Sequence, residues 1–416
     1  MIKNQRPEFD KLIKTISSKT IESKKNILLI GPEGSGKTKL IKYLTHKFKK
    51  FVFKYINIKE IVGIPELFIE RYLEIITGQS ISYNDLEREL IIHESGGLKN
   101  IEQYEKNKTK SLFLKGVSFP NSRKKLFRII ALDDFEYINA LKYFPGFSNI
   151  DAEFLECLSM QKDCLYIVSV NSRSRNDIFF TEKVKEVLTQ WDIIDLEPLD
   201  FELSQSIAEE IPGLSNSKYI PDICILSQGN PGLINLIAQN FKNETNIDSK
   251  QDYQDNFISV LAKSLIKKDG ILHLYLKSIL KCSISKVRGG TSLISCLKVL
   301  AKHESLILKE ISKILLRSPQ VVKDYLDWLV KSGLIEKKQK QYRICDNLLK
   351  YWILLNLTGI SENVKDSPSD SQAFLTIKED FEKMRGISGY RESKMEEEKI
   401  IPQVLVRNEE DLLEFD

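Results

Sequence analysis

The sequence lacks any hydrophobic run long enough to cross a membrane. Nowhere in the 416 residues do we find the roughly 18 consecutive apolar residues that a spanning helix needs. The first residues, read MIKNQRPEFDKL, are too polar for a secretory signal peptide. We therefore expect a cytoplasmic protein that has no membrane partner.

Cysteine and histidine are scarce and dispersed. The six cysteines include no Cys-x-x-Cys pair, and the four histidines lie far apart. A structural zinc site needs closely spaced pairs of these residues. The spacing favours buried free thiols over zinc ligands.

A large excess of charge of one sign is also lacking. The chain has 62 Lys and Arg residues against 58 Asp and Glu, a net charge of +4. This balance neither requires nor excludes a nucleic-acid partner, because binding depends on clustering of cations on one face. With 42% hydrophobic and 29% charged residues, the composition is that of an ordinary globular protein.

Short apolar runs alternate with helical patterns in the first half of the chain, which is typical of an α/β domain with a parallel sheet. We predict strands at residues 26–30, 51–56, 126–132, 165–170 and 193–196, with helices that include 37–48 and 65–76. The domain is predicted to span residues 1–200. Residues 78–123, which are polar and lack strong periodicity, are interpreted as an insertion.

The second half of the chain has apolar residues at helical spacing. We predict a helical lid at residues 201–288, a winged-helix domain at 289–358, and a linker with an acidic C-terminal segment at 359–416. In the winged helix, Ser318 and Pro319 are predicted to open the third helix, which Gly333 ends. A hairpin follows, with strands at 334–337 and 342–345.

A phosphate-binding loop is the most specific motif. It reads GPEGSGKT and consists of Gly31, Pro32, Glu33, Gly34, Ser35, Gly36, Lys37 and Thr38. The glycines allow consecutive N–H groups to surround phosphate oxygens, and the following helix adds its N-terminal dipole. Lys37 is expected to reach the β- and γ-phosphates and Thr38 to ligate Mg²⁺. The apolar strand before the loop and the helix after it support nucleotide binding, with ATP or ADP and Mg²⁺ as cofactors.

Acidic residues follow the strand predicted at 126–132. Asp133 and Asp134 end it, and Glu136 comes two residues later. An acid at the carboxyl end of a buried strand beside a phosphate loop can hold Mg²⁺, and a second can orient the attacking water. We assign Asp133 to the metal and Asp134 to the water, with Glu136 as the alternative for the second role.

The strand predicted at 165–170 is followed by polar residues that begin with Asn171 and include Arg173. A polar group here can sense the γ-phosphate, and an arginine can offset charge in the transition state. A basic loop that simply ends the strand remains the alternative.

These pieces, in this order, resemble the STAND branch of the AAA+-related ATPases, in particular archaeal-type ATPases with a C-terminal winged helix. The resemblance covers about residues 2–357. It implies that Asn4 and Arg6 lie near the adenine, and that Ser172 and Arg173 form a sensor.

The resemblance also assigns a role to a turn in the second half. Gly229-Asn230-Pro231-Gly232 looks like the family's glycine–proline motif in the lid, where the proline packs on the base. Taken alone, the motif would be equally well explained as a turn before a helix.

One residue type is missing from a long stretch. No arginine occurs between Arg175 and Arg288. Ring-forming AAA+ motors use an arginine finger after the sensor strand and usually a lid arginine as well. Since an arginine in place raises the rate by orders of magnitude, its absence favours a slow nucleotide switch over a motor.

DNA binding by the predicted winged helix is open. The candidate phosphate contacts are Lys323, Lys337, Lys338, Lys340 and Arg343. Two acids on the same helix as Lys323, Asp324 and Asp327, weaken base reading, so contact with the DNA backbone is favoured. The module can also serve only for packing or for docking of a protein partner.

Three functions are compatible with these motifs. The leading interpretation is a STAND-type ATPase switch that binds ATP, hydrolyses it slowly and couples its nucleotide state to assembly or DNA engagement through the winged helix. The partners considered are double-stranded DNA, a second copy of the chain and another protein. A replication-initiator-like or transposition-type AAA+ DNA ATPase is the first alternative. A non-catalytic scaffold that binds nucleotide is the second.

Overall fold

The computed structural model describes most of the chain. The described residues are 7–18, 25–48, 51–86, 101–118, 128–161, 163–172, 179–214, 217–243, 253–284, 290–358 and 372–387.

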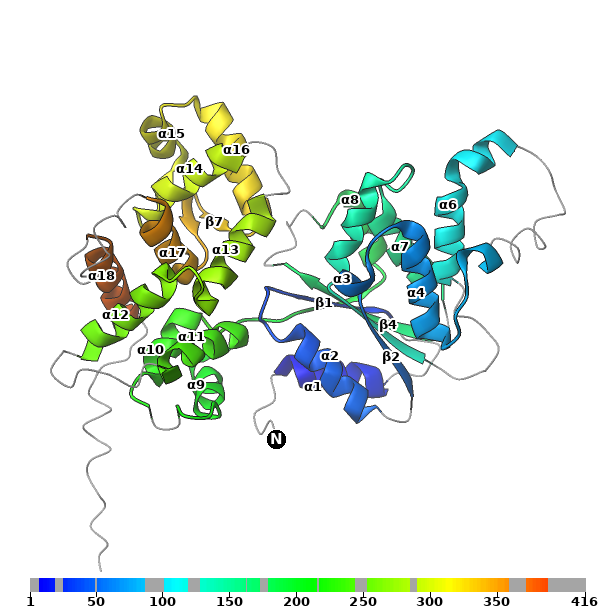
Figure 1. Cartoon of the computed structure of the whole chain (residues 1–416), viewed down its shortest axis with the longest axis horizontal. Helices are drawn as coiled ribbons and strands as arrows, with labels where there is room; N and C mark the ends of the chain where they lie inside the picture. Colours follow the sequence, from blue (N-terminus) through cyan, green and yellow to red (C-terminus); the bar gives the residue numbers. More distant parts are fainter. Residues whose placement is uncertain are drawn as a thin grey trace, which may run out of the picture.

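A five-stranded parallel sheet forms the centre of the first domain (Figure 1). In chain order its strands are β1 (Ile27–Gly31), β2 (Val52–Asn57), β3 (Arg128–Asp133), β4 (Cys164–Asn171) and β5 (Asp192–Asp195). In space the order is β2-β3-β4-β1-β5. Each strand lies within two residues of its predicted position, so the predicted α/β P-loop fold is confirmed.

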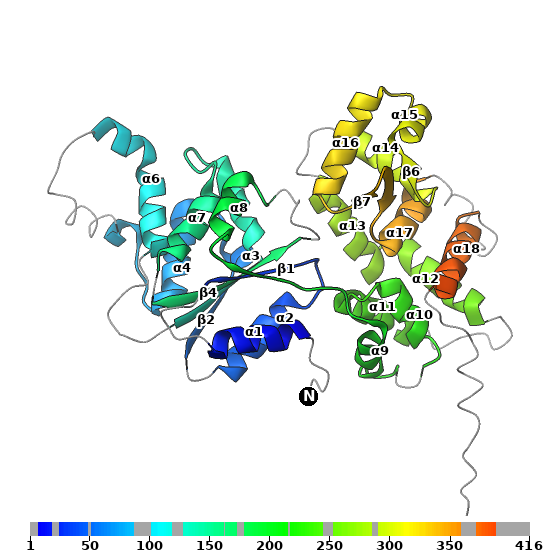
Figure 2. The ribbon, with the colours of Figure 1, turned by 180° about the vertical axis from the view of Figure 1, so that it is seen from behind.

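Helices cover both faces of the sheet (Figure 2). On one face lie α1 (Pro7–Ser18) and α2 (Lys37–Lys47), which pack against alternate strand residues such as Leu29 and Ile167. On the other lie α4 (Pro65–Thr77), α6 (Ile101–Ser118), α7 (Ile150–Ser159) and α8 (Glu182–Leu188). Burial on both faces explains why the central strands β1, β3 and β4 are almost continuously apolar.

The segment interpreted as an insertion contributes to this core. Within it, α6 packs against α4 and α7. Phe113 of α6 is fully buried, with its ring 5.3 Å from that of Phe68 on α4. Residues 101–118 are therefore part of the α/β domain. Residues 87–100 and 119–127 lie outside the described residues.

Five helices follow the sheet, in the region predicted to be the lid. They are α9 (Phe201–Glu209), α10 (Ile220–Ser227), α11 (Pro231–Asn243), α12 (Tyr253–Ile266) and α13 (Ile271–Ile284). The turn between α10 and α11 is joined to the connection after β5, because Leu199 N donates to Gly229 O at 2.8 Å. Gly229 has φ +73°, and a Cβ there would lie 2.3 Å from Leu199 O, so the position requires glycine.

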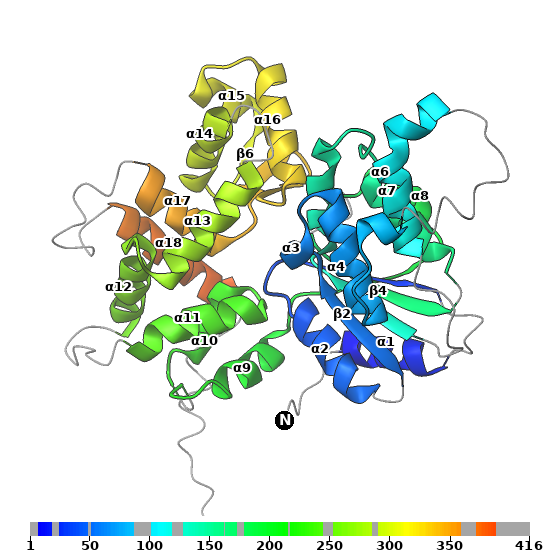
Figure 3. The same cartoon turned by 45° about the vertical axis from the view of Figure 1, so that its right-hand side comes forward.

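Residues 290–357, hereafter the C-terminal module, contain helices and a small sheet. The helices are α14 (Gly290–Ala301), α15 (Leu308–Leu315), α16 (Pro319–Lys331) and α17 (Asn347–Leu357). The strands β6 (Leu306–Ile307), β7 (Ile335–Lys338) and β8 (Gln341–Ile344) form an antiparallel sheet in the order β6-β8-β7. Pro319 begins α16 as predicted, although the Ser318 side chain makes no capping hydrogen bond. Figure 3 shows α15 and α16 at one end of this half of the molecule and α9–α11 at the other.

A last helix, α18 (Gln372–Ile387), lies inside the segment predicted as linker and acidic tail. It bridges the lid and the C-terminal module. Arg385 Nε lies 3.0 Å from Asp222 of α10, Lys378 pairs with α12, and Asp380 pairs with Lys350 of α17. The Phe381 ring stacks on Phe257 at 5.4 Å. Lid, C-terminal module and α18 share one hydrophobic core.

No helix in the described part of the chain combines the length and apolar character needed to cross a bilayer.

Candidate functional site

The phosphate loop connects β1 to α2 at the carboxyl edge of the sheet. Gly34 and Gly36 have φ angles of +81° and +97°, which only glycine adopts without strain. The first N–H groups of α2 have no side-chain cap, because its N-cap is Gly36. A Cβ added at Gly36 would meet no atom within 4 Å, so there is open space before the helix. This cradle fits a phosphate group.

Lys37 lies at the centre of the loop. Its Nζ donates to Gly31 O at 2.8 Å, to Pro32 O at 3.0 Å and to Asn171 Oδ1 at 2.6 Å. Burial lowers the pKa of Lys37, and nearby carboxylates, Glu136 first, oppose that shift. The ammonium group is thus held where β- and γ-phosphates would need a cation.

Asp133 ends β3 and is completely buried. Its carboxylate accepts hydrogen bonds from Thr38 Oγ1 at 2.6 Å, Tyr55 OH at 3.0 Å and Ser169 Oγ. Burial and the neighbouring Asp133 raise the pKa of Tyr55, so it stays a donor. The pairing of Thr38 with a carboxylate fits Mg²⁺, which is bound by few protein oxygens together with phosphates and water.

Asp134 has φ +54° and ψ +44°, a left-handed conformation that is uncommon for a residue other than glycine. Its Oδ1 accepts from Asn171 Nδ2 at 2.9 Å and its Oδ2 from Asn57 Nδ2 at 3.2 Å. Two amide groups thus fix the orientation of this carboxylate. Strained backbone of this kind clusters at functional sites.

Glu136 lies in the first turn of the short helix η2 (Phe135–Tyr143), close to Asp134 in sequence. It accepts from Asn171 Nδ2 at 2.6 Å and from Asn171 N at 3.1 Å. Burial raises the pKa of Glu136, which its hydrogen bonds to Asn171 oppose. Asn171 thus joins Lys37 to both acids proposed for water activation.

Three side chains of this site were not found from the sequence: Tyr55, Asn57 and Ser169. Asn57 carried a usable signal, because it is a polar residue that ends a strand adjacent to β3. Tyr55 and Ser169 lie inside their strands, and only the sheet order places them beside Asp133.

The turn between α10 and α11 is bonded to the phosphate loop. Asn230 Nδ2 donates to Glu33 O at 2.8 Å, and Gly232 N donates to Gly34 O at 2.9 Å. The two glycines nearly touch, since a Cβ at Gly232 would lie 2.7 Å from Gly34 Cα. We call this pair of hydrogen bonds the lid clasp.

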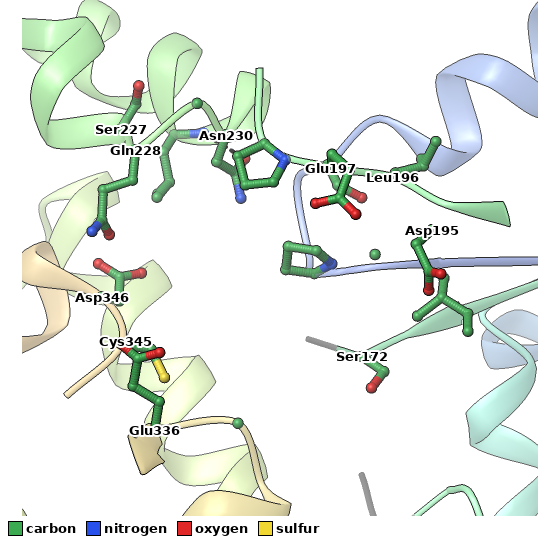
Figure 4. Close-up of a pocket in the computed structure, with 18 of the residues that line it drawn as sticks. Ser172, Asp195, Leu196, Glu197, Ser227, Gln228, Asn230, Glu336, Cys345 and Asp346 are labelled. Atoms are coloured by element: carbon green, nitrogen blue, oxygen red, sulfur yellow. Dashed lines mark hydrogen bonds between the residues drawn. The ribbon is translucent and has the colours of Figure 1, made fainter. Parts of the chain in front are cut away.

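A cavity of about 570 Å³ adjoins the clasp, a volume within the usual range for small-ligand sites. Figure 4 shows Ser172 and Asp195 facing Glu336 and Asp346 across it. Its walls come from the phosphate loop, the connection after β5, the lid turn and the C-terminal module. The lining side chains from the first three include Pro32, Ser35, Glu197, Gln228, Asn230 and Leu233, and those from the C-terminal module include Val330, Lys337 and Cys345.

The roles predicted for Pro231, Asn4, Arg6 and Arg173 stay predictions. Pro231, which the resemblance placed on the base, is not among the residues that line the cavity, although its neighbour Asn230 is. Asn4, Arg6 and Arg173 lie outside the described residues.

The cations predicted to contact DNA are on α16, on β7 and β8, and on the turn between those strands. Lys323 is exposed on α16 and Lys340 on the turn. Arg343 and Lys338 both pair with Glu336, the latter at 3.4 Å. Lys337 lies 5.2 Å from the Tyr342 ring centre and also lines the cavity. The basic cluster is therefore partly neutralised.

Solved structures similar to this chain include a Walker-type ATPase and a protein solved with bound nucleotides. A Walker-type ATPase of Pyrococcus abyssi has 14% identity and a TM-score of 0.53, covering 85% of this chain and 99% of that chain. The ORC2 protein of Aeropyrum pernix, in ADPNP and ADP complexes, has 13% identity and a TM-score of 0.50, covering 84% and 93%. A STAND protein of Pyrococcus horikoshii with a tetratricopeptide repeat sensor has 16% identity and a TM-score of 0.31, covering 84% and 42%.

At such low identity, the two structures with TM-scores of 0.53 and 0.50 support the fold alone. Among curated proteins, no sequence matches the chain. The sequence does match the KAP family P-loop domain, over residues 5–382. That match spans the sheet, the lid, the C-terminal module and most of α18. The chain therefore belongs to the KAP family of P-loop NTPases.

Proposed function

We propose that the chain is a STAND-type switch that binds MgATP and hydrolyses it slowly, and that nucleotide controls how the lid and the C-terminal module are held against the α/β domain. The observation that carries this proposal is the cavity, because its walls come from all three parts of the chain. A ligand that fills such a cavity stabilises the arrangement that forms it.

The phosphate end of the nucleotide would lie in the loop. Lys37 would exchange its hydrogen bonds to Gly31 O and Pro32 O for phosphate oxygens while keeping its contact with Asn171. Thr38 and Asp133 would hold Mg²⁺, which neutralises charge developing on the phosphates. The nucleoside would extend into the cavity towards Asn230 and Leu233.

Two carboxylates are available for the attacking water. Asp134 is our first choice, because two amide groups fix its direction. Glu136 is the alternative, since its raised pKa suits a general base, although both of its oxygens are engaged by Asn171. The absence of arginine between Arg175 and Arg288 supports slow turnover, because no arginine in that stretch of the lid can offset transition-state charge.

The C-terminal module combines the helices α14, α15 and α16 with a three-stranded antiparallel sheet, followed by α17, and we propose that it acts as a winged helix. Its exposed cations, Lys323 and Lys340 among them, suit contact with DNA phosphates. This cluster also favours the second candidate function, a DNA-loading ATPase of the initiator type. Alternatively, the same switch controls self-association or the binding of a protein partner.

Substitution of the loop lysine tests the proposal. Wild-type protein should bind MgATP and release phosphate slowly, and Lys37→Ala should lose both because its phosphate cation is gone. Lys39→Ala is the matched control, because Lys39 follows in the same helix and is exposed. Equal ATP binding by wild type and Lys37→Ala would overturn the proposal. Binding without any phosphate release would instead support a non-catalytic scaffold.

A further inference from the structure

We propose that nucleotide bound in the cavity acts through Glu336 to free Lys338 and Arg343, on the β7–β8 hairpin, for contact with nucleic-acid phosphates. This inference rests on the proposed nucleotide site and adds a regulatory connection to it.

The sheet register places the three charges on one face of the β7–β8 hairpin. Glu336 is directly opposite Arg343, and Lys338 is two residues further along the same strand as Glu336. Glu336 Oε1 pairs with Arg343 Nε, and its Oε2 lies 3.4 Å from Lys338 Nζ. One carboxylate therefore engages two of the cations predicted to contact DNA.

Glu336 also belongs to the cavity wall. Figure 4 shows it beside Cys345 and Asp346, on the side opposite Ser172 and Asp195. Only about 31% of its side chain is exposed, whereas Lys338 and Arg343 are 68% and 48% exposed. The acid thus lies between the nucleotide cavity and two solvent-facing cations.

A nucleoside offers hydroxyl and amino hydrogens to this wall, and a carboxylate only accepts hydrogen bonds. When Glu336 turns to accept one, its two oxygens move together, so both ion pairs open. Exposed pairs of this type are weak, and a hydrogen bond to a charged group in a cavity is stronger, so the exchange is favourable. The freed cations then contact phosphates and release counterions from the nucleic acid.

The coupling is reciprocal by thermodynamic linkage. If MgATP tightens binding of a nucleic acid, that nucleic acid must tighten binding of MgATP by the same factor. This relation provides an independent measurement of the same connection.

The experiment measures binding of a short fluorescent DNA duplex by anisotropy, with and without Mg²⁺ and a non-hydrolysable ATP analogue. For wild type we expect the analogue to tighten duplex binding by about tenfold, the combined effect of two weak pairs. Glu336→Gln should bind the duplex equally tightly with and without the analogue. Without the analogue, duplex binding by Glu336→Gln should depend more steeply on salt than binding by wild type. The slope of log affinity against log salt concentration should be steeper by about 0.9 for each freed cation.

Glu304→Gln is the matched control. It makes the same change in net charge within the C-terminal module, but Glu304 is exposed, does not line the cavity and forms no salt bridge among the described residues. It should behave as wild type. If Glu304→Gln and Glu336→Gln tightened duplex binding equally, the proposal would be overturned, because the change in net charge alone would explain the effect.

Direct titration with the labelled ATP analogue separates this inference from the proposed function. Failure of the wild type to bind the analogue would refute the nucleotide site itself. Normal analogue binding without any change in duplex affinity, or without duplex binding at low salt, would refute only the role of Glu336.

Discussion

Replacement of Gly232 by alanine tests whether the lid clasp contributes to the nucleotide site. Gly232 lies in the first turn of α11 and does not have a positive φ, so alanine fits its backbone. Alanine is also the better helix former, by up to about 1 kcal/mol. Helix propensity alone therefore predicts a neutral or stabilising substitution.

The contact with the phosphate loop predicts the opposite. The new Cβ would lie 2.7 Å from Gly34 Cα and 3.1 Å from Gly34 O. Since carbon atoms pack at about 3.5–4.0 Å, the lid turn must move away by about 1 Å. The bonds from Gly232 N and Asn230 Nδ2, now 2.9 and 2.8 Å long, would stretch or break. Each contributes about 1 kcal/mol net, so the lid should lose about 1–2 kcal/mol of attachment.

Calorimetric titration with MgATP measures the consequence. If the clasp positions the cavity wall, this loss weakens MgATP binding by about tenfold. Gly386→Ala is the control, because Gly386 is also in a helix, without a positive φ, and a Cβ there would meet no atom within 4 Å. It should leave affinity unchanged. Wild-type affinity in Gly232→Ala would refute a role for the clasp in binding.

Three further substitutions test separate parts of the account. Asp134→Ala should still bind MgATP but release phosphate at least about 100-fold more slowly, as a single-turnover assay would reveal; an unchanged rate would move the role to Glu136. Burial raises the pKa of Glu136 above 4.5, so the folded chain binds the carboxyl proton more tightly than the unfolded chain does. The free energy of unfolding therefore falls as the pH rises through the folded-state pKa and Glu136 ionises. Glu136→Gln should therefore raise the unfolding temperature by about 1–3 °C at pH 8, and this gain should vanish near pH 4.5; a gain independent of pH would contradict the assignment. Phe381→Ala, which empties a buried site beside Phe257, should cost about 3–5 kcal/mol in urea unfolding of the C-terminal half, and a cost below about 1 kcal/mol would show that α18 is not part of its core.

The α/β domain was predictable because its signals are local. The central strands β1, β3 and β4 are mostly apolar runs. In the phosphate loop, the positive φ angles of Gly34 and Gly36 require glycine. Asp133 and Asp134 follow their strand directly, so their place at the sheet edge could be inferred without knowing the strand order.

Features that depend on contacts between distant segments were not predictable. Helix α6 has only a weak amphipathic pattern, and its helical structure is supported by packing of residues such as Phe113. Helix α18 follows a polar stretch and acquires its role through pairs with α10, α12 and α17. The partners of Asp133 on β2 and β4 follow from the sheet order.

The lysines of strand β7 are another case in which the sequence alone could not predict the contacts. In the sequence, Lys337 and Lys338 look like one basic cluster. The strand register separates them, since Lys338 pairs with Glu336 whereas Lys337 lies against Tyr342. Whether a lysine is available to bind a phosphate depends on this pairing, and the pairing cannot be read from the amino-acid composition.

Hydrogen exchange with and without MgATP tests whether nucleotide holds the lid and the C-terminal module against the α/β domain, because it reports on all three parts of the chain at once. We expect MgATP to protect the phosphate loop at 31–38, the lid turn at 229–232 and strand β7 in the same experiment. Protection confined to the phosphate loop would contradict it, because the lid and the C-terminal module would then take no part in holding the nucleotide.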